Sequence, residues 1–445
     1  IDIMAVLCNT KQNTVHGVLR AILCDSLYHE DNTCLEQIEK FGSMQALREM
    51  TARYTGYADE KYDLYDLATQ ILLTAFSAIG DETVLSGLEK FLSPEHQPAC
   101  YAFIDEWNAS AEQEKLFEIA NDITERMRLT ERLEKVDTAI LMQSDSLPCI
   151  DAVIIERFLQ EIAENVIKTE EILNVTESRR TAKWYNRYAY LYDGLYYIAK
   201  MQEFHYAHIT GFHFGTEKEL WDSYCKELYW MDTYYRRLHM DFRKSLFNTL
   251  GTLDDLFKSA VVTAEHLYQN WYLSELNGSW NSLIKESVAD GFSQNGILQQ
   301  DDFYRRVVQP IARESRVFVI ISDALRYEVA TELTEKLLRE TNGTAKQSAM
   351  QSVFPSITKF GMAALLPHKA LTITDSMKMF CDEMPTDGTE NRDKILKRTN
   401  PKNCAVTYET LLTMKQAQRR ELVSGADVVY IYHNTIDAVG DKANT

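Results

Sequence analysis

Over its first 311 residues, the chain repeats apolar positions at the three- and four-residue steps of an α-helix. Residues at these steps share one face of a helix. Breaks between the periodic segments coincide with proline, as at 144–148. We predict two helical domains, 1–148 and 149–311, without the fixed period of a solenoid. A representative apolar set is Leu67, Ile71, Leu72 and Phe76.

Two segments of the second helical domain are rich in aromatic residues. Such a face either stacks on nucleic-acid bases or packs against other helices. No run of Lys or Arg interleaves the aromatic residues, and the surroundings are acidic. We therefore favour helix packing. The first set is Trp184, Tyr188, Tyr192 and Tyr196, and the second is Trp221, Tyr224, Leu228, Met231 and Tyr235.

The pattern changes near residue 312. The segment 316–322 is a continuous apolar run, which predicts a strand buried on both faces. A helix-like pattern follows it, and 426–433 predicts a second strong strand. A shorter apolar run at 348–354 predicts another. Strands that alternate with helices indicate a parallel α/β sheet, which we assign to a third domain at 312–445.

Charge divides the chain at the same place. The net charge is −19, and residues 312–445 hold 18 basic and 17 acidic residues, so a net −20 lies in residues 1–311. A surface this acidic repels nucleic acid and favours a basic protein partner. A well-solvated helical surface with no partner explains the same charge.

Cysteine usage and hydropathy point to a soluble cytoplasmic protein. The eight cysteines are scattered and none forms a CxxC pair, which favours reduced thiols over disulfides or a thiolate zinc site. No apolar stretch approaches the length that spans a bilayer, and no signal peptide follows Ile1. We expect no membrane contact. Because the chain begins with Ile rather than Met, we also expect a fragment.

Polar residues follow the predicted strands, at the edge where open α/β sheets gather ligands. Asp323 directly follows 316–322, where a carboxylate either caps the next helix or holds a divalent metal. Thr358 begins a predicted helix, whose N-terminal amides and dipole favour an anionic ligand or alkoxide, although a Thr at this place also commonly caps a helix. Asp437 and Asp441 follow 426–433 in a Gly-containing segment, which suits a metal-binding turn or an ordinary exposed turn.

In this order, the segments resemble the alkaline phosphatase superfamily. Asp323 matches its first Asp, and Pro355–Thr358 resembles the P-x-x-T nucleophile turn of its phosphodiesterase and pyrophosphatase branch. Asp437 matches its Asp-x-x-Gly-His motif, with Asp441 in the place of His. The segments SDALRYE, FPSITKFGMAALLP and YIYHNTIDAVGD look like the PglZ proteins of type 1 BREX phage-defence systems. Before residue 312 the resemblance is only architectural.

The resemblance implies an α + α/β fold, in which a long all-helical N-terminal region precedes the first part of an alkaline-phosphatase-like α/β domain. It also implies two divalent metal ions, with zinc the usual metal and manganese or magnesium as alternatives. Asp323 would bind one ion beside the nucleophile Thr358, and Asp437 and Asp441 would bind the other.

Four further residues are candidate substrate contacts. His433 and Asn434 lie beside the third motif, where they either orient substrate or make local hydrogen bonds. Arg392 and Lys394 belong to a basic stretch that either contacts phosphate or forms a solvated helix face. The late Asp-His and final His of the superfamily do not occur in this sequence. We expect the catalytic domain to be incomplete and the chain alone to be inactive or nearly so.

The implied activity is that of a metal-dependent phosphodiesterase or nuclease in a BREX anti-phage system, with DNA as a substrate. The alternatives are a phosphomonoesterase on a small substrate and a non-catalytic scaffold of the defence complex. In each case the acidic helical region would dock other BREX proteins, with BrxB and the methyltransferase PglX as candidates.

Overall fold

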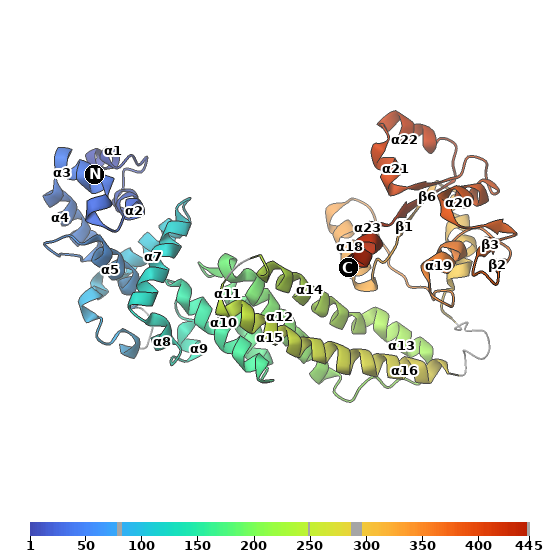
Figure 1. Ribbon diagram of the computed structural model, residues 1–445, viewed down its shortest axis with the longest axis horizontal. Helices are drawn as coiled ribbons and strands as arrows, with labels where there is room; N and C mark the ends of the chain where they lie inside the picture. The colour runs from blue at the N-terminus through green and yellow to red at the C-terminus, as the bar shows by residue number, and fades with distance from the viewer. Residues whose placement is uncertain (78–81, 248–249, 286–295, 443–445) are drawn as a thin grey trace. The chain divides into compact units, whose positions relative to one another are not determined.

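The structure is a computed structural model that describes residues 1–445 except 78–81, 248–249, 286–295 and 443–445 (Figure 1). The chain forms two compact units. Unit 1 comprises residues 1–209 and 234–271, and unit 2 comprises residues 210–233 and 272–445. Within the described residues, none of the helices combines the length and the apolar character needed to cross a membrane.

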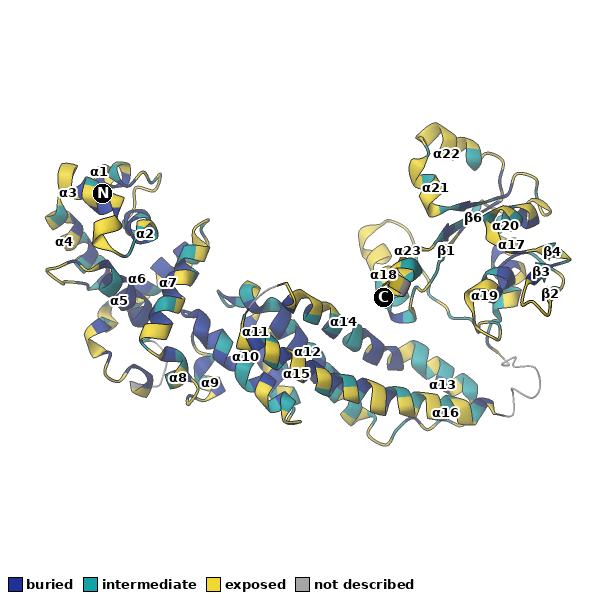
Figure 2. Ribbon diagram, in the orientation of Figure 1, coloured by how far each residue is buried: buried dark blue, intermediate teal, exposed yellow. Residues whose placement is uncertain are grey.

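Unit 1 consists of helices and short helical turns in its described residues. Most helices turn an apolar face inward, and the buried residues follow these faces (Figure 2). Side-chain caps fix several helix starts, as where Asp63 accepts a hydrogen bond from the backbone N–H of Asp66. The helices of the first part are α1 (Asp2–Leu7), α2 (Val15–Asp25), α3 (Thr33–Phe41), α4 (Met44–Thr55), α5 (Leu64–Phe76), α6 (Gln97–Asn108), α7 (Gln113–Arg126), α8 (Leu129–Leu133) and α9 (Thr138–Leu141).

Longer helices complete unit 1. α10 packs on α15, and α11 packs on α12. Gly194 of α12 allows a close approach, because a Cβ there would lie 2.3 Å from the Phe257 ring of α15. The first aromatic set is mostly buried, with Trp184, Tyr188 and Tyr192 each at most 4% exposed, so it packs as expected. These helices are α10 (Pro148–Ala163), α11 (Thr169–Arg179), α12 (Tyr185–Ala207), α15 (Thr252–His266) and the later part of α14 (Tyr229–Ser245).

Unit 2 begins with a helical arm, by which we mean residues 210–233 and 272–284. It contains α13 (Glu217–Ser223), the π-helical turn η5 (Tyr224–Leu228), the first residues of α14 and α16 (Ser274–Ile284). The second aromatic set divides between two environments here. Leu228 and Met231 are buried, whereas Trp221 and Tyr224 are only partly buried.

The rest of unit 2 is an α/β domain built on a parallel sheet in the order β1-β6-β5. One face packs Val319, Tyr430 and Tyr432 against Phe360 of α19 and Ile395 of α20. A separate antiparallel sheet has the order β2-β3-β4. The strands are β1 (Val317–Ser322), β2 (Leu371–Ile373), β3 (Met379–Cys381), β4 (Met384–Pro385), β5 (Cys404–Thr407) and β6 (Val428–His433). The helices are α17 (Gln309–Ala312), α18 (Tyr327–Glu340), α19 (Thr358–Ala364), α20 (Gly388–Lys397), α21 (Tyr408–Thr413), α22 (Gln416–Leu422) and α23 (Thr435–Lys442).

The fold class is the one predicted, but three local predictions are wrong. β1 is buried on one face only, because it is an edge strand whose Phe318 and Ile320 side chains are 51% and 67% exposed. Residues 348–354 form no strand, and only Gln351 makes a single bridge, to Gln299. The segment after β6 is the helix α23 and not a glycine turn, since Gly440 continues the helix.

Candidate active site at the strand ends of the α/β domain

The carboxyl ends of β1 and β6 bring two of the expected residues side by side. The parallel register pairs Ser322 with His433, and the backbone N–H of Asp323 donates to the His433 carbonyl at 3.0 Å. The Ser322 hydroxyl lies 2.9 Å from His433 Nδ1. The Tyr408 ring meets the His433 ring edge to face at 5.1 Å. Asp323 and an oriented imidazole therefore share one edge of the sheet.

Asp323 does not cap the helix that follows it. α18 begins at Tyr327, and its N-cap is Arg326. The Asp323 carboxylate instead accepts a hydrogen bond from the backbone N–H of Ala324, which has a left-handed φ of 61°. The turn thus holds a half-buried carboxylate at the strand end, in the position expected for a metal ligand.

The loop after Asp323 is anchored to the helical arm. Arg326 lies 3.1 Å from the Asp232 carboxylate and 2.8 Å from that of Glu328. Asp232 also accepts hydrogen bonds from the hydroxyls of Tyr224 at 2.8 Å and Tyr272 at 3.1 Å. Burial, followed by the Asp232 charge, raises the pKa of Tyr224 above its ordinary value, so this phenol remains a donor. The arm therefore fixes the position of the turn that carries Asp323.

Thr358 occupies the first position of α19 and is exposed. The N-cap of this helix is Ile357, and no side-chain hydrogen bond caps it. The hydroxyl therefore does not serve as a cap, which was the alternative to a chemical role. Phe360 and Ala363, on the other face of α19, are buried in the core that also contains Val319 and Tyr430, so this core joins the helix to the sheet.

Asp437 lies in the first turn of α23 and is half-buried. Asp441 belongs to the same helix, but its side chain lies outside the described ones. Among the side chains that the structure describes, no three His, Cys, Asp or Glu residues lie close enough together to hold a metal ion. The structure thus places Asp323 beside His433, but it shows no cluster that joins Asp323 to Asp437.

The remaining candidates differ in their surroundings. The Arg392 guanidinium donates to the Thr386 carbonyl at 3.0 Å and lies 4.7 Å from the centre of the Tyr432 ring. Burial raises the pKa of Tyr432 to about 12, and the charge of Arg392 opposes that rise. Lys394 and Asn434 are exposed. Arg392 therefore already has a structural role, which leaves Lys394 as the more accessible cation of the two.

Sequence reasoning missed Ser322 and Tyr408, the two residues that orient His433. Ser322 directly precedes Asp323 on a predicted strand, so its position at the sheet edge was available from the sequence. Tyr408 follows β5, which has only four residues and escaped detection. Sequence reasoning also missed Asp232, because its hydrogen bond to Arg326 joins residues 94 positions apart in the sequence.

Comparisons with known proteins identify what the α/β domain and the whole chain are similar to. Residues 303–445 match the family model of the BREX system PglZ alkaline phosphatase-like domain. The chain is 31% identical to the alkaline phosphatase-like protein BrxZ of Escherichia coli O9:H4 (strain HS) over 99% of its length and 53% of that protein. It is 29% identical to the alkaline phosphatase-like protein PglZ of Bacillus cereus (strain H3081.97), over 100% of its length and 51% of that protein.

The chain therefore spans about half the length of these curated relatives. No solved structure matches it. The match at 303–445 coincides with the α/β domain that carries Asp323, Thr358 and His433. The resemblance inferred from the motifs is thus confirmed, because residues 303–445 match the PglZ alkaline phosphatase-like domain and the chain is similar along its length to BrxZ and PglZ.

Proposed function

We propose that the chain contributes the nucleophile and the first metal ligands of a phosphoryl-transfer site that hydrolyses phosphodiesters in BREX phage defence. The observation that carries this proposal is the strand-end geometry. Asp323 and an oriented His433 share the carboxyl edge of β1 and β6 in a domain that matches the PglZ family model. Neither Asp323 nor Thr358 is used as a helix cap.

The donors suit divalent cations but form an incomplete set. Asp323 would hold one ion, and Asp437 and Asp441 would hold the other, as zinc, manganese or magnesium. Because the described side chains include no cluster of three potential ligands, these residues account for only part of a two-metal centre. When bound, the ions would offset phosphate charge and favour the ionised hydroxyl of the nucleophile.

The reaction itself would use Thr358. Its Oγ attacks phosphorus, the bond from phosphorus to the leaving alcohol breaks, and the departing oxygen takes up a proton. Water then cleaves the phosphothreonine and restores the hydroxyl. His433, held through Nδ1 by Ser322 and packed against Tyr408, would orient the phosphate group together with Asn434. Lys394, which is exposed on α20, would contribute positive charge.

DNA is the substrate that we favour, because a phosphodiesterase in an anti-phage system meets phage nucleic acid. The acidic residues 1–311, with a net charge of −20, would instead dock basic surfaces of other BREX proteins. BrxB and PglX are the candidates for this contact. The two roles separate along the chain, with chemistry in 312–445 and docking before it.

Replacing the nucleophile tests the catalytic role. In the protein as encoded by its gene, with any residues that flank these 445, we expect Thr358→Ala to lower kcat on bis(4-nitrophenyl) phosphate by roughly 10³-fold or more. Thr358→Ser should retain part of the activity, because it keeps the hydroxyl. Thr372→Ala, which changes an exposed Thr on β2, should be unaffected.

The same assay separates the competing functions. Faster turnover of 4-nitrophenyl phosphate than of the diester would replace the phosphodiesterase proposal with a phosphomonoesterase. If Thr358→Ala still restricts phage like the wild type, the scaffold role replaces both enzymatic ones. Measurements with and without a chelator, followed by the addition of each metal, identify the cation.

A further inference from the structure

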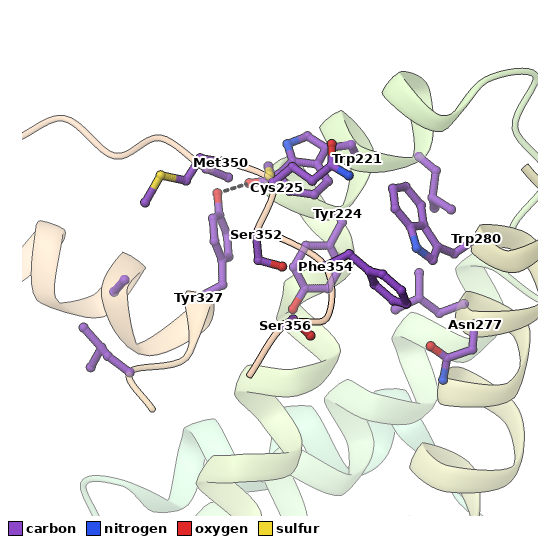
Figure 3. A pocket seen from close by; sticks show the side chains of 16 residues that line it. Trp221, Tyr224, Cys225, Asn277, Trp280, Tyr327, Met350, Ser352, Phe354 and Ser356 are labelled. Atoms are coloured by element: carbon purple, nitrogen blue, oxygen red, sulfur yellow. Dashed lines mark hydrogen bonds between the residues drawn. The ribbon is translucent and has the colours of Figure 1, made fainter. Parts of the chain in front are cut away.

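Unit 2 contains a cleft of about 720 Å³ with aromatic walls (Figure 3). This volume lies within the range of small-ligand sites in proteins. Phe354 projects into the cleft between Tyr224 and Trp280 (Figure 3). The aromatic lining residues are Trp221, Tyr224, Trp280, Tyr327 and Phe354.

One wall of the cleft comes from the helical arm and the other from the two loops of the candidate active site. Trp221, Tyr224 and Trp280 belong to α13, η5 and α16. The opposite wall includes Phe354 and Ser356, which lead directly into Thr358, and Leu325, which lies two residues after Asp323. The cleft therefore adjoins both loops that carry the proposed chemistry.

Contacts between the walls and within the arm wall preform the cleft. The Tyr327 hydroxyl donates to the Cys225 carbonyl at 3.0 Å, and the rings of Tyr327 and Tyr224 lie 5.7 Å apart. Trp221 and Trp280 approach to 6.3 Å between ring centres. Asp232, which does not line the cleft, accepts hydrogen bonds from both Tyr224 and Arg326 and so joins the arm to the loop after Asp323. An arriving ligand would meet ring faces that are already in place, which lowers the entropy lost on binding.

The lining favours a flat and neutral ligand. None of the lining residues that the structure describes carries a formal charge. The polar side chains of the lining are neutral, and they include the amides of Asn277 and Gln351 and the hydroxyls of Ser352 and Ser356. Aromatic side chains stack on bases of every sequence, and amide and hydroxyl groups pair with base edges. A phosphate group finds no cation here, so it would lie outside the cleft, toward Thr358.

We propose that this cleft binds a nucleobase of a nucleic-acid substrate and thereby positions the adjoining phosphodiester at Thr358. This inference rests on the proposed function and adds the substrate class, a nucleotide ester. The sequence pattern predicts that Trp221 and Tyr224 pack against other helices. In this proposal their rings also stack on the base. The first aromatic set in unit 1 has no such part, since three of its four residues, Trp184, Tyr188 and Tyr192, are buried.

Kinetics on a matched pair of esters test the proposal. The protein as encoded should cleave thymidine 5′-(4-nitrophenyl) phosphate with at least about tenfold higher kcat/KM than methyl 4-nitrophenyl phosphate, which has no base. Trp280→Ala and Phe354→Ala should raise KM for the thymidine ester by about tenfold and leave the methyl ester unchanged. Trp230→Ala removes a tryptophan of the same arm outside the cleft and should change neither.

A binding measurement separates failure of the cleft from failure of the catalytic proposal. Calorimetric titration with thymidine 5′-monophosphate requires no turnover. Binding that Trp280→Ala weakens about tenfold and Trp280→Phe preserves supports the cleft even if no ester is hydrolysed. Hydrolysis of both esters with equal kcat/KM, with no nucleotide binding, overturns the cleft while leaving the catalytic proposal intact. The proposal is also overturned if an apolar peptide binds in the cleft and the nucleotide does not displace it.

Discussion

At the scale of single residues, one carboxylate in each unit organises the surrounding aromatic helices. In unit 1, Asp151 is fully buried and receives two hydrogen bonds from Arg179, at 2.8 and 2.7 Å, and one from Tyr192. In unit 2, the Asp232 carboxylate accepts hydrogen bonds from Tyr224, Tyr272 and Arg326. A buried carboxylate is tolerated only when it is paired in this way. Through Arg326, Asp232 also contacts the loop that follows Asp323.

Cysteine reactivity gives a prediction at this scale. Burial, and then the charge of Glu112, raise the pKa of Cys24 from 9.0 to about 11. A raised pKa leaves less thiolate at any given pH, and the thiolate is the reactive form. We expect iodoacetamide labelling of Cys24, followed by mass spectrometry, to keep rising about tenfold per pH unit from pH 8 to 10. In urea the rate should level off near pH 9, and a similar plateau in the native protein would contradict the prediction.

At the scale of helices and strands, the contact of α12 with α15 depends on a glycine, which has no side chain, at position 194. A Cβ on Gly194 would lie 2.3 Å from the Phe257 ring. We expect Gly194→Ala to destabilise this helix pair by about 1–3 kcal/mol, because the crowding outweighs the better helix propensity of Ala. Hydrogen exchange of the α12 and α15 peptides measures the loss.

Gly278 of α16 provides the matched control, since a Cβ there would meet nothing within 4 Å. Gly278→Ala should stabilise its helix by about 0.5–1 kcal/mol. Adding Phe257→Ala to Gly194→Ala should cost less than the sum of the single changes, because it relieves the same clash. Slower exchange in Gly194→Ala than in the wild type would show that the helices do not approach as described.

Elements with a strong and long periodic pattern could be predicted from the sequence, and short ones could not. The helical region, β1 and β6 each have enough residues to show their period. β5 has four residues and β4 only two, so their patterns are indistinguishable from those of loops. The exposure of Phe318 and Ile320 was also hidden, because an apolar run does not reveal which strand lies at the edge.

The candidate site could likewise be predicted only in part. Parallel strands imply adjacent carboxyl ends, which led us to expect Asp323 and the segment that follows 426–433 at one edge of the sheet. The helical state of α23 was missed because Asp and Gly are typical of turns. The anchoring of Arg326 by Asp232 and the aromatic cleft depend on how the arm meets the domain, and no local pattern carries that information.

At the scale of the whole molecule, net charge is unevenly distributed along the chain. Residues 1–311 carry a net charge of −20, and residues 312–445 carry +1. Mobile ions screen this charge beyond about 8 Å at physiological ionic strength, so its effect on DNA is local to each surface. Nucleic acid should therefore avoid the acidic helical surfaces, while it can still approach the nearly neutral α/β domain.

Photo-crosslinking tests this separation in the protein as encoded. With single-stranded DNA that contains 4-thiothymidine, we expect crosslinked peptides from 312–445 and from the arm residues of the cleft, but none from 1–141. The yield should fall between 50 and 200 mM KCl, because phosphate contacts release counterions. Trp280→Ala should remove the arm crosslinks and preserve those near Lys394, since stacking and phosphate attraction are separate contributions. Crosslinks within 1–141 at both salt concentrations would instead assign DNA binding to the acidic helices, and their role in docking basic proteins would then have to be abandoned.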